Sequence, residues 1–330
     1  MSSWTLAEPV GSERRRLLSA IPCESWPPGR DFIASHDGAA VACLRTAEAD
    51  PGDGYHREHV RSLDVWWTDL AALTELAEWA VSRLESRCRL EWELPSSDEA
   101  VLAALEPLEL EEEVRLVGGW RPEGGAKTED LLLVGHAAPS RPGPEVAAPG
   151  RRARPLPPAG SWRIESSSDE SRPALARFLA RLAPGRAYPP GTLLSGAEQV
   201  ETRRRGDLEA DWLLARTDDG EVVGGLVLER PRAPERAHVR RVHLDVLPEA
   251  RERGLGTALF SQAVEQLGDV EHELLEADPR SGHRPVRRAL EAAGFGVAGR
   301  QRGAWRMRTP SASWDEDVVL YQYPAPSGVG

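Results

Sequence analysis

The sequence predicts an α/β (α+β) chain of two domains, on the strength of three observations. First, stretches with the two-residue period of strands alternate with stretches of helical period along most of the 330 residues. Second, residues 138–160 are rich in Pro, Ala, Gly and Arg and lack an apolar period, as expected of a linker. Third, the strands and helices on the two sides of this linker follow one order. We therefore expect one domain at residues 1–137 and a second at residues 161–330.

The first series of elements contains a hairpin and two helices with start signals. Asp37-Gly38 is a turn signal between two apolar runs, and Asp69 is placed to cap a helix. Pro95 ends a strand, and a Ser-Asp pair then starts another helix. The expected strands cover residues 32–35, 39–45, 60–67, 89–94, 113–118 and 131–134, and the expected helices cover residues 14–20, 69–84 and 97–105.

The second series repeats this order of elements. Its hairpin turn is Asp218-Asp219-Gly220, and Gly294 has the position of a helix C-cap. The expected strands cover residues 161–165, 212–216, 221–229, 239–246, 271–277, 318–323 and either 296–299 or 304–308. The expected helices cover residues 170–182, 197–205, 256–267 and 285–293.

Matching residues in the two series indicate a duplication. Asp37-Gly38 corresponds to Asp219-Gly220, which lies 182 positions later. Leu63-Asp64-Val65 corresponds to Leu244-Asp245-Val246, at an offset of 181. The offset then grows slowly along the chain, as small loop insertions require. A repeat of this length predicts two copies of one domain rather than a solenoid.

Charge is divided unevenly between the two parts of the chain. Residues 1–150 contain 14 Lys and Arg against 27 Asp and Glu, whereas residues 151–330 contain 27 against 26. A chain with a net charge of −12 lacks the basic balance of a nucleic-acid-binding protein, so we expect no nucleic-acid partner. The near-neutral second part is the better host for a polyanionic cofactor.

Other features of the sequence limit where the protein works. No apolar run approaches the roughly eighteen residues of a membrane span, and no signal-peptide core follows the start, so we expect a cytoplasmic protein without a membrane partner. Cys23, Cys43 and Cys88 are too few and too scattered for a disulfide framework or a metal site. A single lysine against forty arginines is typical of a GC-rich bacterial genome.

The stretch from Val239 to Leu267 has the order strand, glycine turn, helix. The backbone N–H groups of such a turn and the N-terminus of its helix converge on one point, which favours an anion. Gly254 and Gly256 allow a phosphate to approach the backbone closely. In the first series the strand instead runs directly into Trp66-Trp67-Thr68-Asp69, without glycines. We therefore expect only the second domain to hold a phosphate in this way.

A dinucleotide-binding Rossmann turn is the main rival interpretation of these glycines. That motif needs a third glycine, which allows close contact between helix and strand. The third position is Leu259 in this sequence. The sequence therefore disfavours the Rossmann interpretation, and a purely structural turn is the other alternative.

These residues resemble a known family. Leu-x-Val-x-Pro-x-x-Arg-x-x-Gly-x-Gly, present as residues 244–256, is similar to the acyl-CoA-binding signature of the GNAT acetyltransferases. Residues 276–279 and Ala293-Gly294-Phe295 resemble the strand–helix–Gly-Phe segment that follows it. The likeness covers residues 161–323, whereas residues 1–137 match only in the order of elements. It implies two tandem GNAT-like domains, each a mixed, mostly antiparallel central sheet flanked by helices, with a degenerate N-terminal copy that lacks the pyrophosphate loop.

The resemblance assigns a cofactor, acetyl-CoA or another acyl-CoA, and residues that bind it. Leu244 and Val246 offer their main chain to the pantetheine arm, and the Val246 backbone donor, at a strand bulge, stabilises the oxyanion. His283 stands where the family often has an asparagine at a helix start, and joins the cofactor-binding set. The N–H groups that would hold the pyrophosphate belong to Arg251, Glu252, Arg253, Gly254, Leu255, Gly256 and Thr257.

The resemblance leaves the acid and base less well defined. Asp278 ends a strand where some family members place a catalytic glutamate, and Glu276 lies one strand period earlier. Each also has a structural interpretation, because Asp before Pro often shapes a turn. Many family members have a tyrosine that acts as the general acid for the thiolate, and Leu290 stands at that position here. Tyr321 and Tyr323 are then alternative proton donors. The strand before the loop also carries polar residues, with His243 and Asp245 on one face and His238 and Arg240 on the other.

Three functions remain open at this point. The first is an N-acyltransferase that transfers an acetyl or other acyl group from acyl-CoA to an amino group of a small molecule or peptide. The second is a long-chain N-acyltransferase of natural-product biosynthesis, which takes its acyl group from CoA or from an acyl carrier protein. The third is a CoA-binding sensor or scaffold without activity.

Overall fold

The computed structural model resolves the chain into two compact units. Unit 1 combines residues 1–115, 130–142 and 301–317, and unit 2 combines residues 116–129, 143–300 and 318–330. The predicted boundaries at residues 137 and 161 stay a prediction. The described residues are 4–19, 21, 29–48, 60–84, 89–122, 125, 127–135, 162–182, 210–231, 234–267, 273–279, 281–308 and 313–325.

Unit 1 holds the strands β1-β2-β3-β4-β5-β7 in this order, together with β6 up to Arg115 and the end of β13 from Gln301. Only β4 and β5 pair in parallel, and the pairs β1–β2, β2–β3, β3–β4 and β5–β7 are antiparallel. Its elements are β1 (Thr5–Ala7), α1 (Gly11–Leu18), β2 (Gly29–His36), β3 (Ala39–Glu48), β4 (Val60–Trp67), α2 (Leu70–Val81), β5 (Arg89–Pro95), α3 (Glu99–Ala104), β6 (Glu111–Trp120) and β7 (Glu129–Gly135).

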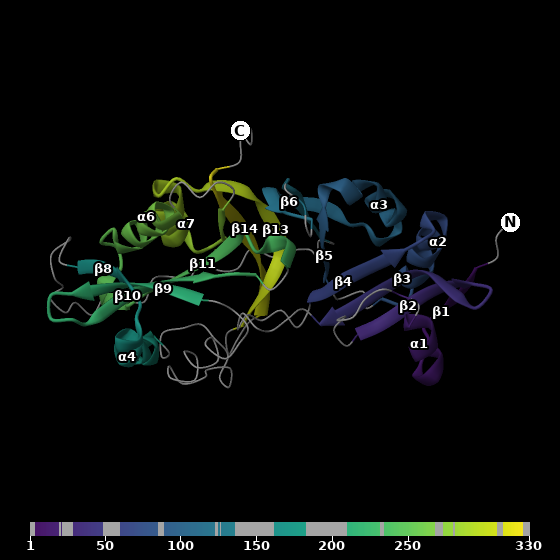
Figure 1. Cartoon of the computed structure of the whole chain (residues 1–330), viewed down its shortest axis with the longest axis horizontal. Helices are drawn as coiled ribbons and strands as arrows, with labels where there is room; N and C mark the ends of the chain where they lie inside the picture. Colours follow the sequence, from purple (N-terminus) through teal and green to yellow (C-terminus); the bar gives the residue numbers. More distant parts are fainter. Residues whose placement is uncertain are drawn as a thin grey trace. The chain divides into compact units, whose positions relative to one another are not determined.

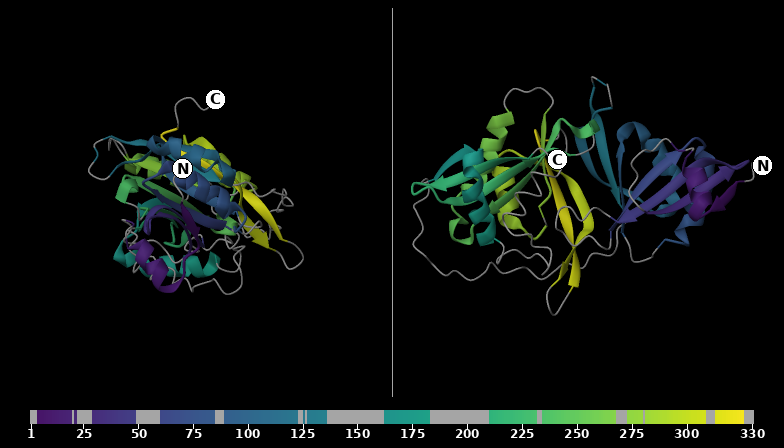
Figure 2. Two further views of the ribbon diagram at one scale, coloured as in Figure 1. Left: turned by 90° about the vertical axis from the view of Figure 1, so that its right-hand side faces the viewer. Right: turned by 60° about the horizontal axis from the view of Figure 1, so that its bottom comes forward.

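Unit 2 holds the strands β8-β9-β10-β11-β12 in this order, followed by β14 from Val318 and β13 up to Arg300, together with β6 from Leu116. Its parallel pair is β11–β12, and β8–β9, β9–β10, β10–β11 and β12–β14 are antiparallel. Its elements are β8 (Trp162–Ser166), α4 (Arg172–Leu182), β9 (Ala210–Thr217), β10 (Val222–Glu229), β11 (Val239–Val246), α6 (Leu255–Leu267), β12 (Leu274–Ala277), α7 (Arg284–Ala292), β13 (Gly296–Arg308) and β14 (Ser313–Tyr323). Strands β13 and β14 lie side by side (Figure 2).

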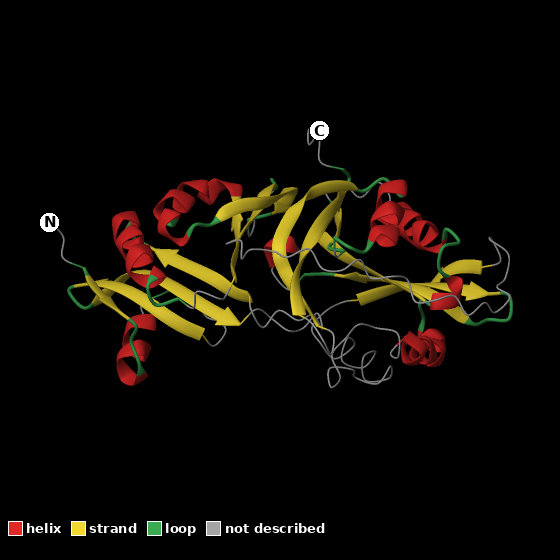
Figure 3. Cartoon of the chain, turned by 180° about the vertical axis from the view of Figure 1, so that it is seen from behind, coloured by secondary structure: helices red, strands yellow, loops and turns green. Residues whose placement is uncertain are grey.

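Each unit therefore has helices on both faces of a mixed, mostly antiparallel sheet, which confirms the predicted fold class. In unit 2, α6 and α7 cover one face and α4 the other, as Figure 1 shows. In unit 1, α2 and α3 lie on one face and α1 on the other (Figures 1 and 3). The core of unit 2 joins apolar side chains of α4, α6 and the strands between them, with Phe178, Leu259 and Phe260 fully buried.

Several predicted bounds differ from the observed ones. The two alternative strands at residues 296–299 and 304–308 are one strand, β13, and β1 was not expected. Helix α1 covers Gly11–Leu18, so it begins three residues and ends two residues earlier than predicted. The predicted helix at residues 197–205 lies outside the described residues.

The sheet register corrects the predicted alignment of the two halves. Val60 on β4 pairs with Arg89 at the start of β5, and Val239 on β11 pairs with Leu274 at the start of β12. Val60 therefore corresponds to Val239, at an offset of 179 rather than 181. A shift of two residues keeps every side chain on its face of the sheet, so the sequence pattern does not distinguish the two offsets.

The connection from strand to helix differs between the units. In unit 1 only Thr68 and Asp69 link β4 to α2, and the Asp69 carboxylate accepts a hydrogen bond from the Ala72 N–H at 3.0 Å. In unit 2, residues 247–254 separate β11 from α6. The helix of unit 1 is thus capped by a carboxylate of its own chain, at the place where unit 2 has a loop.

We expect Asp69→Ala to lower the free energy of unfolding by about 0.5–2 kcal/mol, because the first turn of α2 loses its side-chain cap. Urea unfolding followed by tryptophan fluorescence measures this change. Glu75→Ala, on the exposed face of the same helix, is the matched control and should change stability by less than about 0.5 kcal/mol. Equal effects of the two variants would contradict the capping role.

Candidate functional site

The loop between β11 and α6 is fixed at both ends by hydrogen bonds. The Leu247 N–H donates to the Val223 carbonyl at 3.0 Å, which holds the start of the loop to β10. The segment Pro248–Ala250 then forms one 3₁₀ turn. The Arg251 side chain folds back, and its Nε donates to the Val246 carbonyl at 3.0 Å. The loop therefore has a defined path between strand and helix.

Gly254 sets the position at which α6 begins. Its carbonyl accepts a hydrogen bond from the Ala258 N–H at 2.9 Å, so it is the first acceptor of the helix. The N–H groups of the next three residues have no acceptor within the helix, as at every helix N-terminus. These residues are Leu255, Gly256 and Thr257, which belong to the predicted anion-binding set.

Two loop residues have a left-handed backbone. Glu252 has φ +61° and Gly254 has φ +81°. A Cβ at Gly254 would meet no atom within 4 Å, so the glycine serves the backbone conformation and faces open space. The N-terminus of α6 is therefore open to a ligand at this position.

Gly256 has a packing role in addition to the predicted one. A Cβ at this position would lie 3.0 Å from Cδ2 of Leu244 on β11 and 3.6 Å from Cβ of Ala289 on α7. The missing side chain allows the first turn of α6 to pack against a strand and a neighbouring helix. A glycine is needed here for this packing, and its N–H group is also one of those at the start of the helix.

Strand β11 continues beyond its parallel neighbour. The β11–β12 pairing ends at Arg241 and Glu276, whereas β11 runs on to Val246. The Leu247 N–H donates to the Val223 carbonyl, so Leu247 and Val223 form a hydrogen-bonded pair. Hydrogen-bonded and non-hydrogen-bonded pairs alternate along an antiparallel ladder, so the next pair, Val246 and Gly224, has no mutual hydrogen bonds. The main-chain groups of Val246, and of Leu244 two residues before it, therefore point away from β10, to the side from which β12 has diverged.

The predicted bulge at Val246 is absent from this register. The β10–β11 pairing is continuous from Gly224–Val246 to Glu229–Arg241, and the register shift in β10 lies toward β9, between Val222 and Gly224. The divergence arises instead because β12 is only four residues long and ends at Ala277, before Pro279.

The two faces of β11 carry different side chains. Leu244 and Val246 pack on the core beside α6. His243 and Asp245 face the α4 side, since Asp245 is paired with Gly225, where a Cβ would lie 3.3 Å from Phe178. The parallel register places Glu276 and Asp278 on the same side.

The structure brings Asp278 together with His243 and with Glu229 of β10. Asp278 Oδ1 lies 4.0 Å from His243 Nδ1, and Glu229 Oε2 lies 3.6 Å from His243 Nε2. The sequence placed His243 on this strand but gave no sign of Glu229, because its approach depends on the register between β10 and β11.

Glu276 has surroundings unlike those of Asp278. Its side chain is 5% exposed and forms an ion pair with the Arg236 guanidinium, itself 2% exposed. His238 lies next to this pair and contacts the Gly118 carbonyl through Nε2 at 2.8 Å. Burial is the main cause that lowers the pKa of His238, and Arg121 and Arg236 lower it further. This buried cluster connects the start of β11 with β12.

The remaining predicted residues lie on or near α7. His283 is the N-cap residue of α7 and is exposed, without a side-chain cap hydrogen bond. The Tyr321 hydroxyl donates to Glu291 at 2.7 Å and accepts from Arg287 at 3.2 Å. Burial raises the pKa of Tyr321, so its hydroxyl keeps its proton at neutral pH. Tyr323 stacks at a tilt on Phe295, with ring centres 5.7 Å apart.

Leu290 is fully buried, as a core residue of α7. Leu290 therefore gives this helix no hydroxyl at the position where the family often has a tyrosine.

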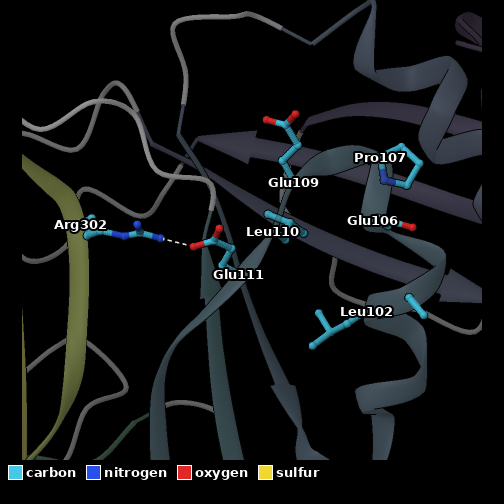
Figure 4. A pocket seen from close by; sticks show the side chains of 8 residues that line it. Leu102, Glu106, Pro107, Glu109, Leu110, Glu111 and Arg302 are labelled. Atoms are coloured by element: carbon cyan, nitrogen blue, oxygen red, sulfur yellow. Dashed lines mark hydrogen bonds and ion pairs between the residues drawn. The ribbon is translucent and has the colours of Figure 1, made fainter.

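A pocket in unit 1 is separate from all of these residues (Figure 4). It has an apolar part and an acidic rim, on which Glu111 pairs with Arg302 at 2.5 Å. It is lined by Leu102, Ala103, Glu106, Pro107, Glu109, Leu110, Glu111 and Arg302. Among the described residues there is no cluster of side chains suited to a metal ion, and no helix is long and apolar enough to cross a membrane.

Comparison with known proteins points to one family. Residues 186–295 match the model of the acetyltransferase (GNAT) family. No curated protein matches the chain.

Solved structures that match this chain cover about half of it. A GCN5-related N-acetyltransferase from Kribbella flavida is 20% identical, covers 50% of this chain and 98% of its own, and has a TM-score of 0.42. The structure of yncA from Salmonella typhimurium with its cofactor acetyl-CoA is 16% identical, with coverages of 52% and 98% and a TM-score of 0.42. The ribosomal-protein-S5-alanine acetyltransferase from Vibrio fischeri is 13% identical, with coverages of 49% and 92% and a TM-score of 0.40.

We expect Arg236→Met to lower the free energy of unfolding by about 3–5 kcal/mol, because it leaves the Glu276 carboxylate buried without its cation. Chemical denaturation measures the loss. Arg181→Met is the control in the same unit: it removes partly exposed ion pairs with Glu221 and Glu249 and should cost less than about 1 kcal/mol. A loss no greater than that of the control would mean that Glu276 does not depend on Arg236.

Proposed function

We propose that this chain, which carries a GNAT-family domain at residues 186–295, transfers an acyl group from acetyl-CoA or another acyl-CoA to an amino group of a small molecule or peptide. The observation that carries the proposal is the position of the α6 N-terminus. It lies directly after β11, at the strand that has diverged from its parallel neighbour.

The loop and the first turn of α6 fit a pyrophosphate. Three helix N–H groups without helical acceptors and the left-handed residues Glu252 and Gly254 present backbone donors around open space. The exposed Arg251 adds a positive charge beside them. We assign the whole segment from Arg251 to Thr257 to the pyrophosphate, and His283 to the edge of the cofactor site.

The donor arm would lie where β11 and β12 separate. Leu244 and Val246 turn their main-chain groups toward this gap, and the Val246 carbonyl is already taken by Arg251. The Val246 N–H is then the group directed at the reacting carbonyl, where it would stabilise the oxyanion. The bound acyl-CoA supplies the thioester carbonyl carbon and the thiol leaving group.

The acceptor would approach from the α4 side of the sheet. Asp278 is half-buried there, whereas Glu276 is held in its ion pair with Arg236, so we assign Asp278 to the acceptor side of the site and a structural role to Glu276. The Tyr321 hydroxyl is directed to Glu291, so we assign it no proton transfer to the thiol.

We infer that unit 1 is the degenerate copy of this domain. Its order of strands and helices is that of unit 2, but Asp69 caps the helix that would bind the anion. Trp67 occupies the position that corresponds to Val246. Unit 1 therefore offers no equivalent anion loop within the part of the chain that the structure describes.

Two other functions are distinguished by experiment. A long-chain or carrier-protein-dependent N-acyltransferase would use the same main-chain donors, and a CoA-binding sensor or scaffold would use the same loop. A panel of acyl-CoAs of increasing chain length, with small amines and peptides as acceptors, separates them by thiol release. We expect release with acetyl-CoA or another short acyl-CoA. Tight acetyl-CoA binding without release for any member of the panel would contradict the proposed transfer.

We expect Gly254→Val to weaken acetyl-CoA binding at least about 100-fold, which corresponds to about 2.7 kcal/mol. The branched side chain disfavours φ +81° and occupies the open space in front of the loop. Isothermal titration calorimetry gives the dissociation constant.

Gly220→Val is the matched control for this measurement. Gly220 also has φ +81° and open space around it, but it lies in the β9–β10 turn. This variant should lose stability as Gly254→Val does, and its affinity for acetyl-CoA should stay unchanged. Unchanged affinity in Gly254→Val itself would refute the assignment of the loop.

A further inference from the structure

We propose that His243 accepts the proton of the acceptor ammonium, with Glu229 and Asp278 as the residues that position its ring. The proposal rests on the proposed acyl transfer and names the group that prepares the amine for attack.

The geometry of the imidazole supports this role. Glu229 Oε2 lies 3.6 Å from Nε2 and Asp278 Oδ1 lies 4.0 Å from Nδ1, so a carboxylate lies near each ring nitrogen. The His243 side chain is 19% exposed and that of Glu229 is 14% exposed, whereas Asp278 is 34% exposed. The ring is thus held largely out of solvent, between two strands, while remaining accessible.

The position of His243 in the sheet connects the two sides of the proposed site. It comes two residues after the last β11–β12 pair, so it stands where the strands have begun to diverge. Its side chain faces α4, whereas the loop and α6 lie on the opposite face. An amine that enters from the α4 side would meet the imidazole before it reaches the gap beside Val246.

The surroundings on the α4 side suit a positively charged acceptor. Asp245 lies on the same face as His243, and its partner Gly225 packs near the aromatic rings of Phe178 and Trp212. Arg241 on β11 and the Glu276–Arg236 ion pair at β12 also lie on this face. The carboxylates of Glu229, Asp245 and Asp278 thus share this face, and opposite charges nearby favour the charged form of an ammonium.

Unit 1 supplies an independent comparison. The corrected register aligns Asp64 with His243 and Glu93 with Asp278. Unit 1 therefore keeps carboxylates at this place but has no imidazole, and burial raises the pKa of Asp64. The imidazole and the anion loop occur together in unit 2 and are both missing from the corresponding positions of unit 1.

The transfer balances with these groups. His243 takes one proton from the ammonium and later releases it to solvent. The amine nitrogen then forms a bond to the thioester carbonyl carbon as the carbon–sulfur bond breaks. The second proton lost by the nitrogen passes to the sulfur, which leaves as a thiol.

The test compares His243→Gln with the full-length wild-type protein, using acetyl-CoA as donor and the amine that supports the fastest thiol release. At pH 7 we expect kcat/KM to fall about 10²–10⁴-fold, with the dissociation constant for acetyl-CoA unchanged. Asp64→Asn, at the matching position of unit 1, should leave kcat/KM unchanged.

The carboxylates are tested through the pH profile. Each carboxylate favours the protonated form of the imidazole beside it through its negative charge. Activity needs the neutral ring, so kcat/KM rises with pH as the ring loses its proton. In Asp278→Asn and Glu229→Gln the rising limb should therefore move to lower pH, a shift that loss of packing alone would not produce.

The outcomes separate this proposal from the proposed function. If His243→Gln transfers as fast as the wild type with the same pH profile, the assignment of His243 is wrong while acyl transfer stands. If the wild type binds acetyl-CoA but acylates no amine, the proposed function fails and the role of His243 fails with it.

Discussion

The packing of the first turn of α6 against the sheet is the constraint on which the proposed site depends. Gly256 leaves room for Leu244 of β11, and a Cβ at Gly224 of β10 would lie 2.9 Å from Leu255 at the start of α6. These contacts are possible only without side chains at the two glycines. They place the helix N–H groups beside the strand that carries Val246, so the anion site follows from how closely helix and strand approach.

The two units show how one order of elements gives different helix termini. Both have a parallel pair of strands, connected by a helix, at the same place in the strand order. In unit 1 a two-residue connection allows the chain's own carboxylate, from Asp69, to satisfy the first turn of the helix. In unit 2 the longer loop, with Gly254 in a left-handed conformation, leaves the first turn open. Loop length therefore decides whether the terminus is closed by the protein or available to an anion.

Local features of the site could be predicted from the sequence, and features set by strand register could not. The turn at Gly254 and the face shared by His243 and Asp245 follow from spacing alone. The offset of 179 residues, the straight register at Val246 and the approach of Glu229 depend on which residues pair across strands. A two-residue shift leaves the pattern of faces intact, so periodicity carries no information about these pairings. The packing role of Gly256 does not follow from spacing, because its partners Leu244 and Ala289 are distant in sequence.

Glu276 and Asp278, at the end of β12, have different roles because β11 and β12 diverge between them. Glu276 belongs to the last residue pair with β11, where it is buried, and a buried carboxylate requires a cation such as Arg236 to offset its desolvation. Asp278 comes two residues later, on the same face but beyond the pairing, where solvent reaches it and the neighbouring group is an imidazole. Glu276 has a structural role, because separating it from Arg236 would leave a buried carboxylate without its cation. Asp278 can change its interactions without leaving a buried charge unpaired. The place where β11 and β12 diverge is therefore the place where a carboxylate can take part in acid–base chemistry.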